Sequence, residues 1–385
     1  MTFLSAPPTT RRNFLAASVS GSLALCGPST SSAGPLTTKG KGKVQTPTFH
    51  RHDIGTAPGR LHEPSVDDDG NIWTSPLDGI LWQYHAPTGS LDRFDLAQIT
   101  GRKWAGLHLW PIATGKQVLL CTPSLGRLWV WDRSRKRVTQ HDFPHPSPGV
   151  YGGHPVPGRP QLCLYDTKQG GVLLWDTLKH RGTFYKCPYR LSNTAYMMFI
   201  DRGRMEYWGS SWNGNDVIRF DIERRRWNGH FHCPGKAAKT VVGGGVFDKS
   251  TVYVSDMFNG RLFPLDAATG RWGDPLPVPG HRKWYGYLSG GHRFGDHLYF
   301  DHSTWTGANK SIDGQPHHFI GRWTVFDHSR KAFSRLDFPA RPDETIDDLQ
   351  ADYAITYKDG LYLLAVHRKS PRRALVLRSR PLPTS

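Results

Sequence analysis

The sequence predicts an all-β protein, a seven-bladed β-propeller whose ring is closed by an N-terminal strand in the last blade. The first observation is a repeated pair of short apolar strands, from GNIWTSPLDGILWQY at 70–84 to GLYLLAVHRKSPRRALVLR at 360–378. Seven copies align at Ile72, Val118, Leu162, Met205, Val252, Leu298 and Leu361, in steps of 46, 44, 43, 47, 46 and 63 residues. A period of about 40–50 residues with several strands per unit is typical of propeller blades.

The second observation is the composition. The chain contains 41 glycines and 29 prolines, and 12% of its residues are aromatic. Such a composition is typical of turn-rich β proteins. Apolar residues nowhere keep a helical period long enough to predict a long helix.

Each unit needs an inner and an outer strand besides the repeated pair. Inner strands, which line the central channel, are expected at 61–67, 105–112, 152–156, 195–200, 240–247, 284–290 and 350–356. Outer strands are expected at 90–96, 138–143, 182–187, 227–233 and 333–338. The last unit has no outer strand after residue 378, so residues 48–52 are expected to supply it. Glycines at 243–245 and 290–291 fit inner strands whose backbones approach closely.

The N-terminal segment predicts export. Arg11 and Arg12 precede an apolar run from Ala16 to Leu25, a pattern that resembles a twin-arginine signal, and small residues end at Ala33. We expect a signal peptide at 1–33, a linker at 34–47, a single propeller domain at 48–385 and a periplasmic or secreted location. The alternative is a basic cytosolic N-terminus. No later segment approaches the ~20 apolar residues of a membrane span.

The charge predicts an acidic partner. The formal net charge is +17, and about +15 remains without residues 1–33. This excess attracts polyanions. Export argues against nucleic acid and favours an acidic polysaccharide or oligosaccharide bound by a monomer, although a merely basic secreted protein is the alternative. Cys121 and Cys163 are expected to be buried, while Cys187 and Cys233 are either free or joined by a disulfide.

Three histidines form the most specific candidate site in the sequence. His62 and His108 each lie ten residues before an aligned position, and His154 lies eight before the next. We expect them to face one channel, either as ligands of a divalent Ca, Mn or Zn ion or as catalytic groups. The catalytic alternative needs an acid, for which Tyr196 and Tyr285 are candidates. A coincidental register among nineteen histidines is the remaining alternative.

Further residues of the inner strands and adjacent loops are candidates for substrate binding. Aromatic rings stack on sugars, and amides and cations bind hydroxyls and carboxylates. The candidates are Trp104, Tyr151, Trp212, Asn213, Lys239, Asn259, Trp284, Trp305 and Arg322. The tryptophans within the repeated strands are instead expected to pack between blades. No phosphate-binding loop, nucleophile elbow or paired zinc motif is present.

Two segments carry a family resemblance. Residues 67–96, DDDGNIWTSPLDGILWQYHAPTGSLDRFDL, and 266–278, DAATGRWGDPLPV, resemble the blades of streptogramin (virginiamycin B) lyase-like propellers. That resemblance implies a propeller with a metal-dependent Glu/His site in later blades, for which this chain has no matching HxH-plus-Glu arrangement. In architecture and site composition the chain is also similar to secreted propeller polysaccharide lyases of the rhamnose-glucuronate and ulvan type.

The leading hypothesis is an exported lyase that cleaves a uronic-acid (glucuronate-type) glycan linkage by β-elimination. A streptogramin-type lyase or a glycoside hydrolase on the same fold is the enzymatic alternative. A non-catalytic propeller that binds a glycan or a protein is the other alternative.

Overall fold

The structure is a computed structural model, in which residues 44–385 form one compact unit. It describes residues 49–56, 61–75, 79–104, 109–122, 127–144, 149–192, 195–201, 203–211, 214–234, 240–256, 259–279, 286–304, 322–337, 349–357, 360–367 and 373–379. The predicted signal peptide and linker lie outside these residues. Among the described residues, no helix has the length and apolar character needed to cross a membrane.

The first four sheets each contain four consecutive antiparallel strands. The first comprises β2 (His62–Val66), β3 (Ile72–Ser75), β4 (Ile80–His85) and β5 (Ser90–Asp95). The second comprises β6 (Trp110–Thr114), β7 (Gln117–Cys121), β8 (Leu128–Asp132) and β9 (Arg137–His141). The third comprises β10 (Val150–Pro155), β11 (Gln161–Asp166), β12 (Gly171–Asp176) and β13 (Arg181–Lys186). The fourth comprises β14 (Ala195–Asp201), β15 (Glu206–Ser211), β16 (Asp216–Asp221) and β17 (Arg226–His232).

The next sheet has two halves that meet at a single parallel pair, Gly244 with His292. One half contains β18 (Thr240–Phe247), β19 (Thr251–Asp256), β20 (Arg261–Asp266), β21 (Arg271–Trp272) and β22 (Leu276–Pro277). The other contains β23 (Gly286–Phe294), β24 (His297–Thr304), β25 (Arg322–Asp327) and β26 (Ala332–Asp337). A Cβ on Gly244 would meet the Gly291 carbonyl oxygen. The expected close approach of glycine-rich inner strands is therefore confirmed here.

The last sheet combines both ends of the described chain. β27 (Leu349–Tyr357), β28 (Gly360–His367) and β29 (Arg373–Ser379) are followed at the outer edge by β1 (Phe49–Thr56), antiparallel to β29. Arg93 on β5 donates a hydrogen bond to the Ile54 carbonyl oxygen. The N-terminal strand thus contacts both the last sheet and the first.

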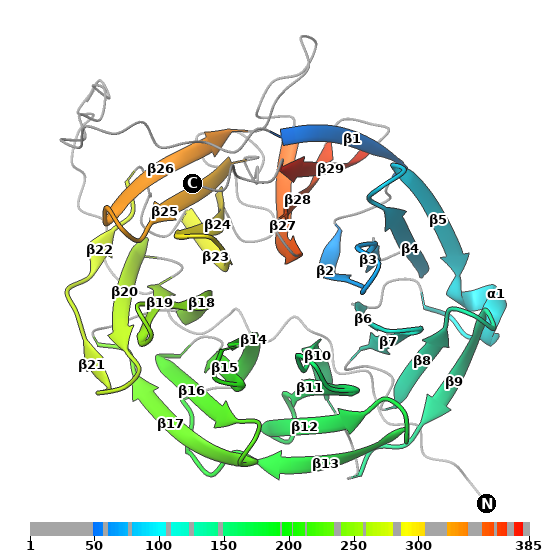
Figure 1. Cartoon of the computed structure of the whole chain (residues 1–385), viewed down its shortest axis with the longest axis horizontal. Coiled ribbons are helices and arrows are strands. Elements are labelled where there is room, and N and C mark those ends of the chain that lie inside the picture. The colour runs from blue at the N-terminus through cyan, green and yellow to red at the C-terminus, as the bar shows by residue number, and fades with distance from the viewer. Residues whose placement is uncertain are drawn as a thin grey trace, which may run out of the picture. The chain divides into compact units, whose positions relative to one another are not determined.

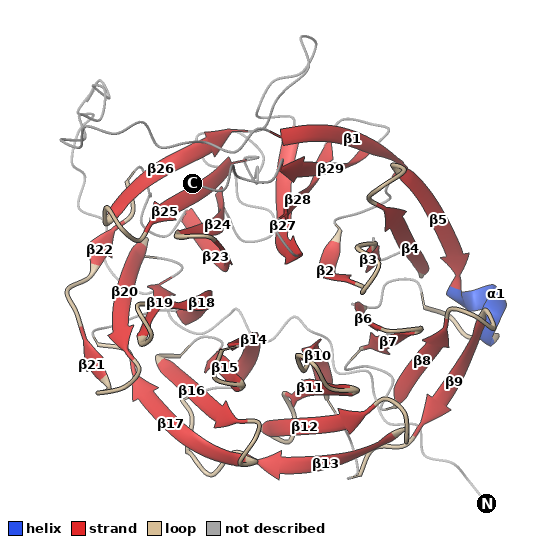
Figure 2. Ribbon diagram, viewed as in Figure 1, coloured by secondary structure: helices blue, strands red, loops and turns tan. Residues whose placement is uncertain are grey.

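The sheets follow one another around a central axis, each with its first strand innermost (Figure 1). The inner strands β2, β6, β10, β14, β18, β23 and β27 contact one another in that order, and β27 also contacts β2. The prediction of an all-β protein built from repeated antiparallel sheets is confirmed. The described helix is α1 (Leu96–Thr100), a short turn outside the ring (Figure 2), capped by the Asp95 carboxylate.

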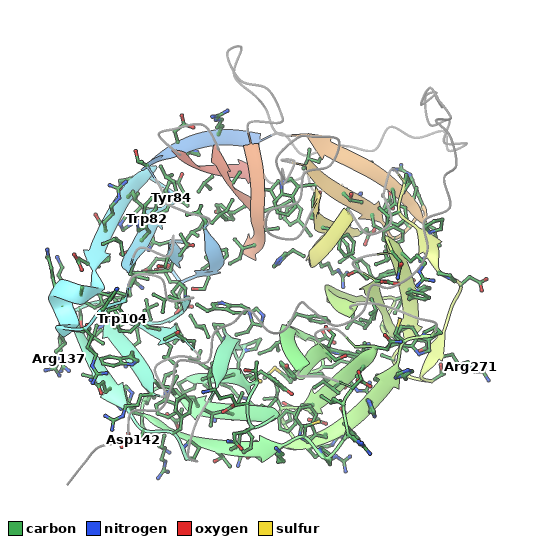
Figure 3. The ribbon with its side chains drawn as sticks, turned by 180° about the vertical axis from the view of Figure 1, so that it is seen from behind. Trp82, Tyr84, Trp104, Arg137, Asp142 and Arg271 are labelled. Carbon is green, nitrogen blue, oxygen red and sulfur yellow. The ribbon has the colours of Figure 1, made fainter. Side chains whose placement is uncertain are left out.

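The hydrophobic core lies between adjacent sheets. Trp73 and Trp131 pack in the cluster between the first and second sheets, and Trp208 packs between the fourth sheet and β18–β20. Between the last sheet and the first, Trp82 and Tyr84 pack with Ile54 (Figure 3). The repeated tryptophans therefore hold sheets together, as the sequence predicts.

Several boundaries and one covalent alternative are corrected. β6 begins at Trp110 rather than at residue 105, and β21 and β22 form an outer edge that the sequence analysis did not include. Cys187 and Cys233 are free and buried, so the disulfide alternative is wrong. Burial raises the pKa of Cys233 to about 12, which keeps this thiol protonated.

Candidate functional site

The structure describes the predicted site residues to different extents. Side chains are described for His154, Trp104 and Asn259. The backbone alone is described for His62 in β2, Tyr151 in β10, Tyr196 in β14 and Arg322 in β25. The others lie outside the described residues, namely His108, Trp212, Asn213, Lys239, Trp284, Tyr285 and Trp305.

His154 lies on inner strand β10 and faces an aromatic neighbour. Its ring is 6.2 Å from that of Trp110 on β6, in an edge-to-face arrangement. The Trp110 ring occupies the space beside Gly152, where a Cβ atom would collide with it. Gly152 therefore lets the indole fill the gap between β6 and β10, and the indole in turn packs against His154.

A second histidine, which sequence reasoning missed, lies at the same depth. His154 is opposite Cys163 in its hairpin, and His292 on β23 is opposite Tyr299. Cys163 and Tyr299 each follow directly after the aligned leucine of their repeat. Burial, with a smaller contribution from the charge of His154, lowers the pKa of His292 to about 4. His292 is therefore neutral near pH 7, at the same register depth as His154.

Counting residues along the sequence missed this pair for two reasons. His292 lies six residues before Leu298 whereas His154 lies eight before Leu162, because the connection between the paired residues is shorter after β23 than after β10. In β2 the register shifts between His62 and Ser65, and this bulge adds a residue without advancing the pairing. Because of this, Ser65 rather than His62 has the register of His154, since Ser65 is opposite Trp73. His62 itself is opposite Ser75, further toward the other end of the strand.

Two other predicted contacts are engaged in structural roles. Trp104 is 1% exposed and packs edge-to-face against Trp129, and its Nε1 donates a hydrogen bond to Thr100 Oγ1 at 2.7 Å. The expectation of a sugar-stacking ring at a channel mouth is thus wrong for Trp104, which lies in the core (Figure 3). Asn259 Nδ2 donates to Asp256 Oδ2 at 2.8 Å and orders the start of β20.

The described residues do not by themselves make the predicted metal site. His154 and His292 supply two imidazole donors, but in the described part of the chain no three His, Cys, Asp or Glu residues gather as ligands. Structural and catalytic zinc sites use at least three protein ligands. The pair is therefore better suited to proton transfer and hydrogen bonding than to holding an ion alone.

A polar cluster on the fourth sheet joins a loop to two strands. Asp216 is 3% exposed and accepts hydrogen bonds from the Ser192 backbone at 2.7 Å and from His230 Nε2 at 2.9 Å. Burial alone would raise the pKa of Asp216, but these hydrogen bonds lower it below its usual value. Because the serine and the histidine both bind the carboxylate, the hydroxyl is not activated by the imidazole. The cluster is therefore structural.

A similar network joins β18–β19 to the turn after β25. His328 is 5% exposed, with Nδ1 at 2.8 Å from Tyr253 Oη and Nε2 at 2.6 Å from Asp248 Oδ2. Lys331 Nζ also donates to Tyr253 Oη, at 2.8 Å. Burial lowers the pKa of Lys331 and raises that of Tyr253. The network adds to the parallel pair, the apolar cluster and the Arg293–Val246 hydrogen bond that also join the two sheet halves.

A cavity of about 870 Å³ lies away from the channel, between the first and second sheets. Trp73, Phe94 and Trp131 line it together with charged turn residues. Arg133 Nη2 is 3.1 Å from the buried Asp67 carboxylate and 3.2 Å from that of Asp69. The lining therefore includes ion pairs that join the two sheets, and it contains none of the predicted site residues.

Comparisons with known proteins agree with this geometry at the level of fold. No family model matches the sequence, and no curated protein matches it. A solved structure described as "Streptogramin B lyase structure" has a TM-score of 0.60 and 10% identity, over 86% of this chain and 98% of that one. Another, "YCF48 bound to D1 peptide", has a TM-score of 0.61 and 9% identity, over 87% and 96%. The chain has a β-propeller fold. At this identity the likeness extends no further than the fold.

Proposed function

We propose that the chain is an exported, seven-bladed β-propeller, closed by β1, that cleaves a uronic-acid glycan by β-elimination in its channel. The observation that carries the proposal is the pair of imidazoles at one depth, His154 on β10 and His292 on β23. Propellers place ligands at the channel where the inner strands converge. A neutral imidazole there is a suitable general base near pH 7.

In this mechanism His154 is the base. A ring nitrogen of His154 takes the C5 proton, the C5–H electron pair forms the C4=C5 double bond, and the C4–O4 bond breaks. Tyr196 or Tyr285 then gives its proton to the departing O4, and Lys239 or Arg322 balances the substrate carboxylate. Because His292 stays neutral, no second positive charge opposes the protonation of His154.

The charge and the N-terminal segment support the choice of substrate and location. A net charge of +17 attracts an acidic polysaccharide or oligosaccharide to a monomeric enzyme. The twin-arginine pattern at Arg11 and Arg12 supports a periplasmic or secreted location, where such glycans occur.

The decisive experiment offers the enzyme a panel of acidic glycans and follows the ultraviolet absorbance of the unsaturated product. We expect His154→Asn to lower kcat at least about 100-fold, the usual contribution of a general base. His297→Asn, which removes an imidazole from β24, is the matched control and should retain activity. The absence of unsaturated product from every glycan would contradict the proposal, and release of reducing sugar without it would indicate a glycoside hydrolase.

A second candidate is a propeller that binds a peptide or glycan without turnover. The observation in its favour is that a solved structure of the same fold is described as bound to a peptide. Saturable binding with unchanged ligand, retained in His154→Asn, would support this candidate. A streptogramin-type lyase is distinguished by incubation with the cyclic antibiotic and chromatography, because ring opening by elimination gives an isomer of unchanged mass that migrates differently.

A further inference from the structure

Four outer strands begin with an arginine in the same register. Arg137, Arg181, Arg226 and Arg271 are the first residues of β9, β13, β17 and β21. Each is paired across its hairpin with the last residue of the preceding strand, which is an aspartate in every case. The same position is Ser90 in the first sheet and Ala332 in the half containing β26. The arginines therefore form one continuous series over consecutive sheets.

The aspartates opposite them bind the turn. Asp132 Oδ1 accepts from the Ser134 hydroxyl at 2.7 Å and from the Arg135 backbone at 3.0 Å. Asp176 Oδ1 accepts from the backbones of Leu178 and Lys179, each at 2.9 Å. In the part of the chain that the structure describes, no ion pair joins any of the four arginines to a carboxylate.

The arginines are exposed, and the turns before them add further cations. The exposed cations of these turns are Arg135, Lys136, Arg137, Lys179, Arg181, Arg224, Arg225, Arg226 and Arg271. The exposed acidic residue among them, Glu223, is 2.9 Å from Arg159 of the neighbouring sheet. Arg135 and Arg224 pair with Asp132 and Asp221 of the same turns. These turns nevertheless keep an excess of cations over carboxylates.

The positions of the four arginines limit which kind of polyanion can contact all of them. Arg137 and Arg271, its two ends, project outward from opposite sides of the ring (Figure 3). A flexible chain that follows the edge can contact both ends. Double-stranded DNA, with a persistence length of about 50 nm, follows so tight a curve only at a high bending cost. Single-stranded nucleic acid needs stacking rings, and Leu178 is the large apolar side chain found exposed among the described residues.

We propose that Arg137, Arg181, Arg226 and Arg271 form an arginine series that binds a carboxylated polysaccharide along the outer edge of the ring. Guanidinium groups bind carboxylates through two parallel hydrogen bonds, and a uronate chain presents carboxylates at regular intervals. The surface is separate from the channel and does not depend on the chemistry proposed there. It would hold a long substrate or anchor the protein to an acidic glycan.

The test is calorimetric titration with soluble polygalacturonate at low and at physiological salt. The variant R137Q/R181Q/R226Q/R271Q is expected to bind at least about tenfold more weakly, with a shallower dependence on salt. The control K103Q/K116Q/K168Q/R190Q removes the same charge from exposed residues outside the series and should bind like the native protein. The four single Gln variants, each expected to weaken binding about twofold, keep the test valid if the quadruple variant misfolds.

Three outcomes overturn the proposal: no binding of polygalacturonate by the native protein, equal weakening in the control variant, or tighter binding of anionic vesicles or an oligonucleotide of equal charge. The channel proposal fails separately. His154→Asn is expected to lose product formation while keeping its affinity for polygalacturonate. The series variant is expected to lose affinity while still cleaving short oligosaccharides.

Discussion

At the residue scale, the channel histidines differ in how the protein treats their charge. His292 is surrounded closely enough that burial disfavours its protonated form, and a nearby imidazole adds to the effect. In the proposed mechanism its role is to stay neutral. The same property links this residue to the stability of the whole chain, because the unfolded imidazole titrates normally.

This linkage predicts an acid-sensitive fold. The pKa of His292 is about 4 when folded, against 6.5 for the ordinary side chain, so the unfolded chain binds more protons between these values. Stability contributed by His292 is complete above pH 6.5 and is lost as the pH falls toward 4, by about 3 kcal/mol in total. Urea unfolding at pH 7.5 and 4.5 should show a smaller pH-dependent loss in His292→Asn than in the native protein. Equal losses would contradict the assignment, and His297→Asn serves as the control.

Sequence reasoning reached one member of this pair. His154 stands in an inner strand that contains a bulge only at its start, so its expected position was close to the observed one. His292 lies outside the inner strand expected at 284–290, because the connection from β23 to β24 is shorter than that from β10 to β11 and the same depth falls nearer to the aligned leucine. Trp104 was misplaced for a different reason: it follows α1, and its indole donates a hydrogen bond to Thr100 at the end of that helix.

At the element scale, the turns between the third and fourth strands share one conformation. A residue directly before the outer strand has a left-handed backbone, with φ between 48° and 74° at Gly89, Lys136, His180, Arg225, Gly270 and Lys331. The preceding Asp or backbone groups close the turn in each case, as at Asp266 and Ala268. Five of these third strands end in an aspartate, namely Asp132, Asp176, Asp221, Asp266 and Asp327. The sequence does not reveal the left-handed position that follows, because four of the six residues there are not glycine.

This geometry predicts different costs for alanine at equivalent positions. Gly270 has φ of 74°, and its added Cβ would make only ordinary contacts with Phe231. Gly270→Ala should therefore lower the free energy of unfolding by about 1 kcal/mol through backbone strain alone. Arg225 at the equivalent turn has the left-handed backbone already in the native protein. Arg225→Ala should therefore change the free energy of unfolding by no more than about 0.5 kcal/mol. Chemical denaturation of both variants measures the two losses in the free energy of unfolding. Equal losses would contradict the explanation by backbone strain.

At the scale of the whole molecule, the repeat specified the ring and the sheets but not the contacts that close it. Apolar strands at a regular interval must pack sheet against sheet, so the order of the inner strands followed from the sequence. The use of β1 beside β29 was expected from a missing outer strand, whereas its contact with the first sheet through Arg93 and Ile54 was not. That contact depends on side-chain lengths across two distant segments, which a repeat period does not encode.

The pairing of β1 with β29 predicts that the last sheet depends on an eight-residue segment. A chain beginning at Leu61 loses the β1–β29 pairing and leaves β29 as an open edge, and it also removes Ile54 from the cluster with Trp82 and Tyr84. We expect a loss of several kcal/mol, comparable to the stability of a typical domain, and a broad thermal transition. A chain beginning at Val44 is the control and should unfold like the full chain. A peptide of residues 49–56 should partly restore the transition when added in excess. A sharp, unshifted transition without β1 would show that the last sheet is stable without it.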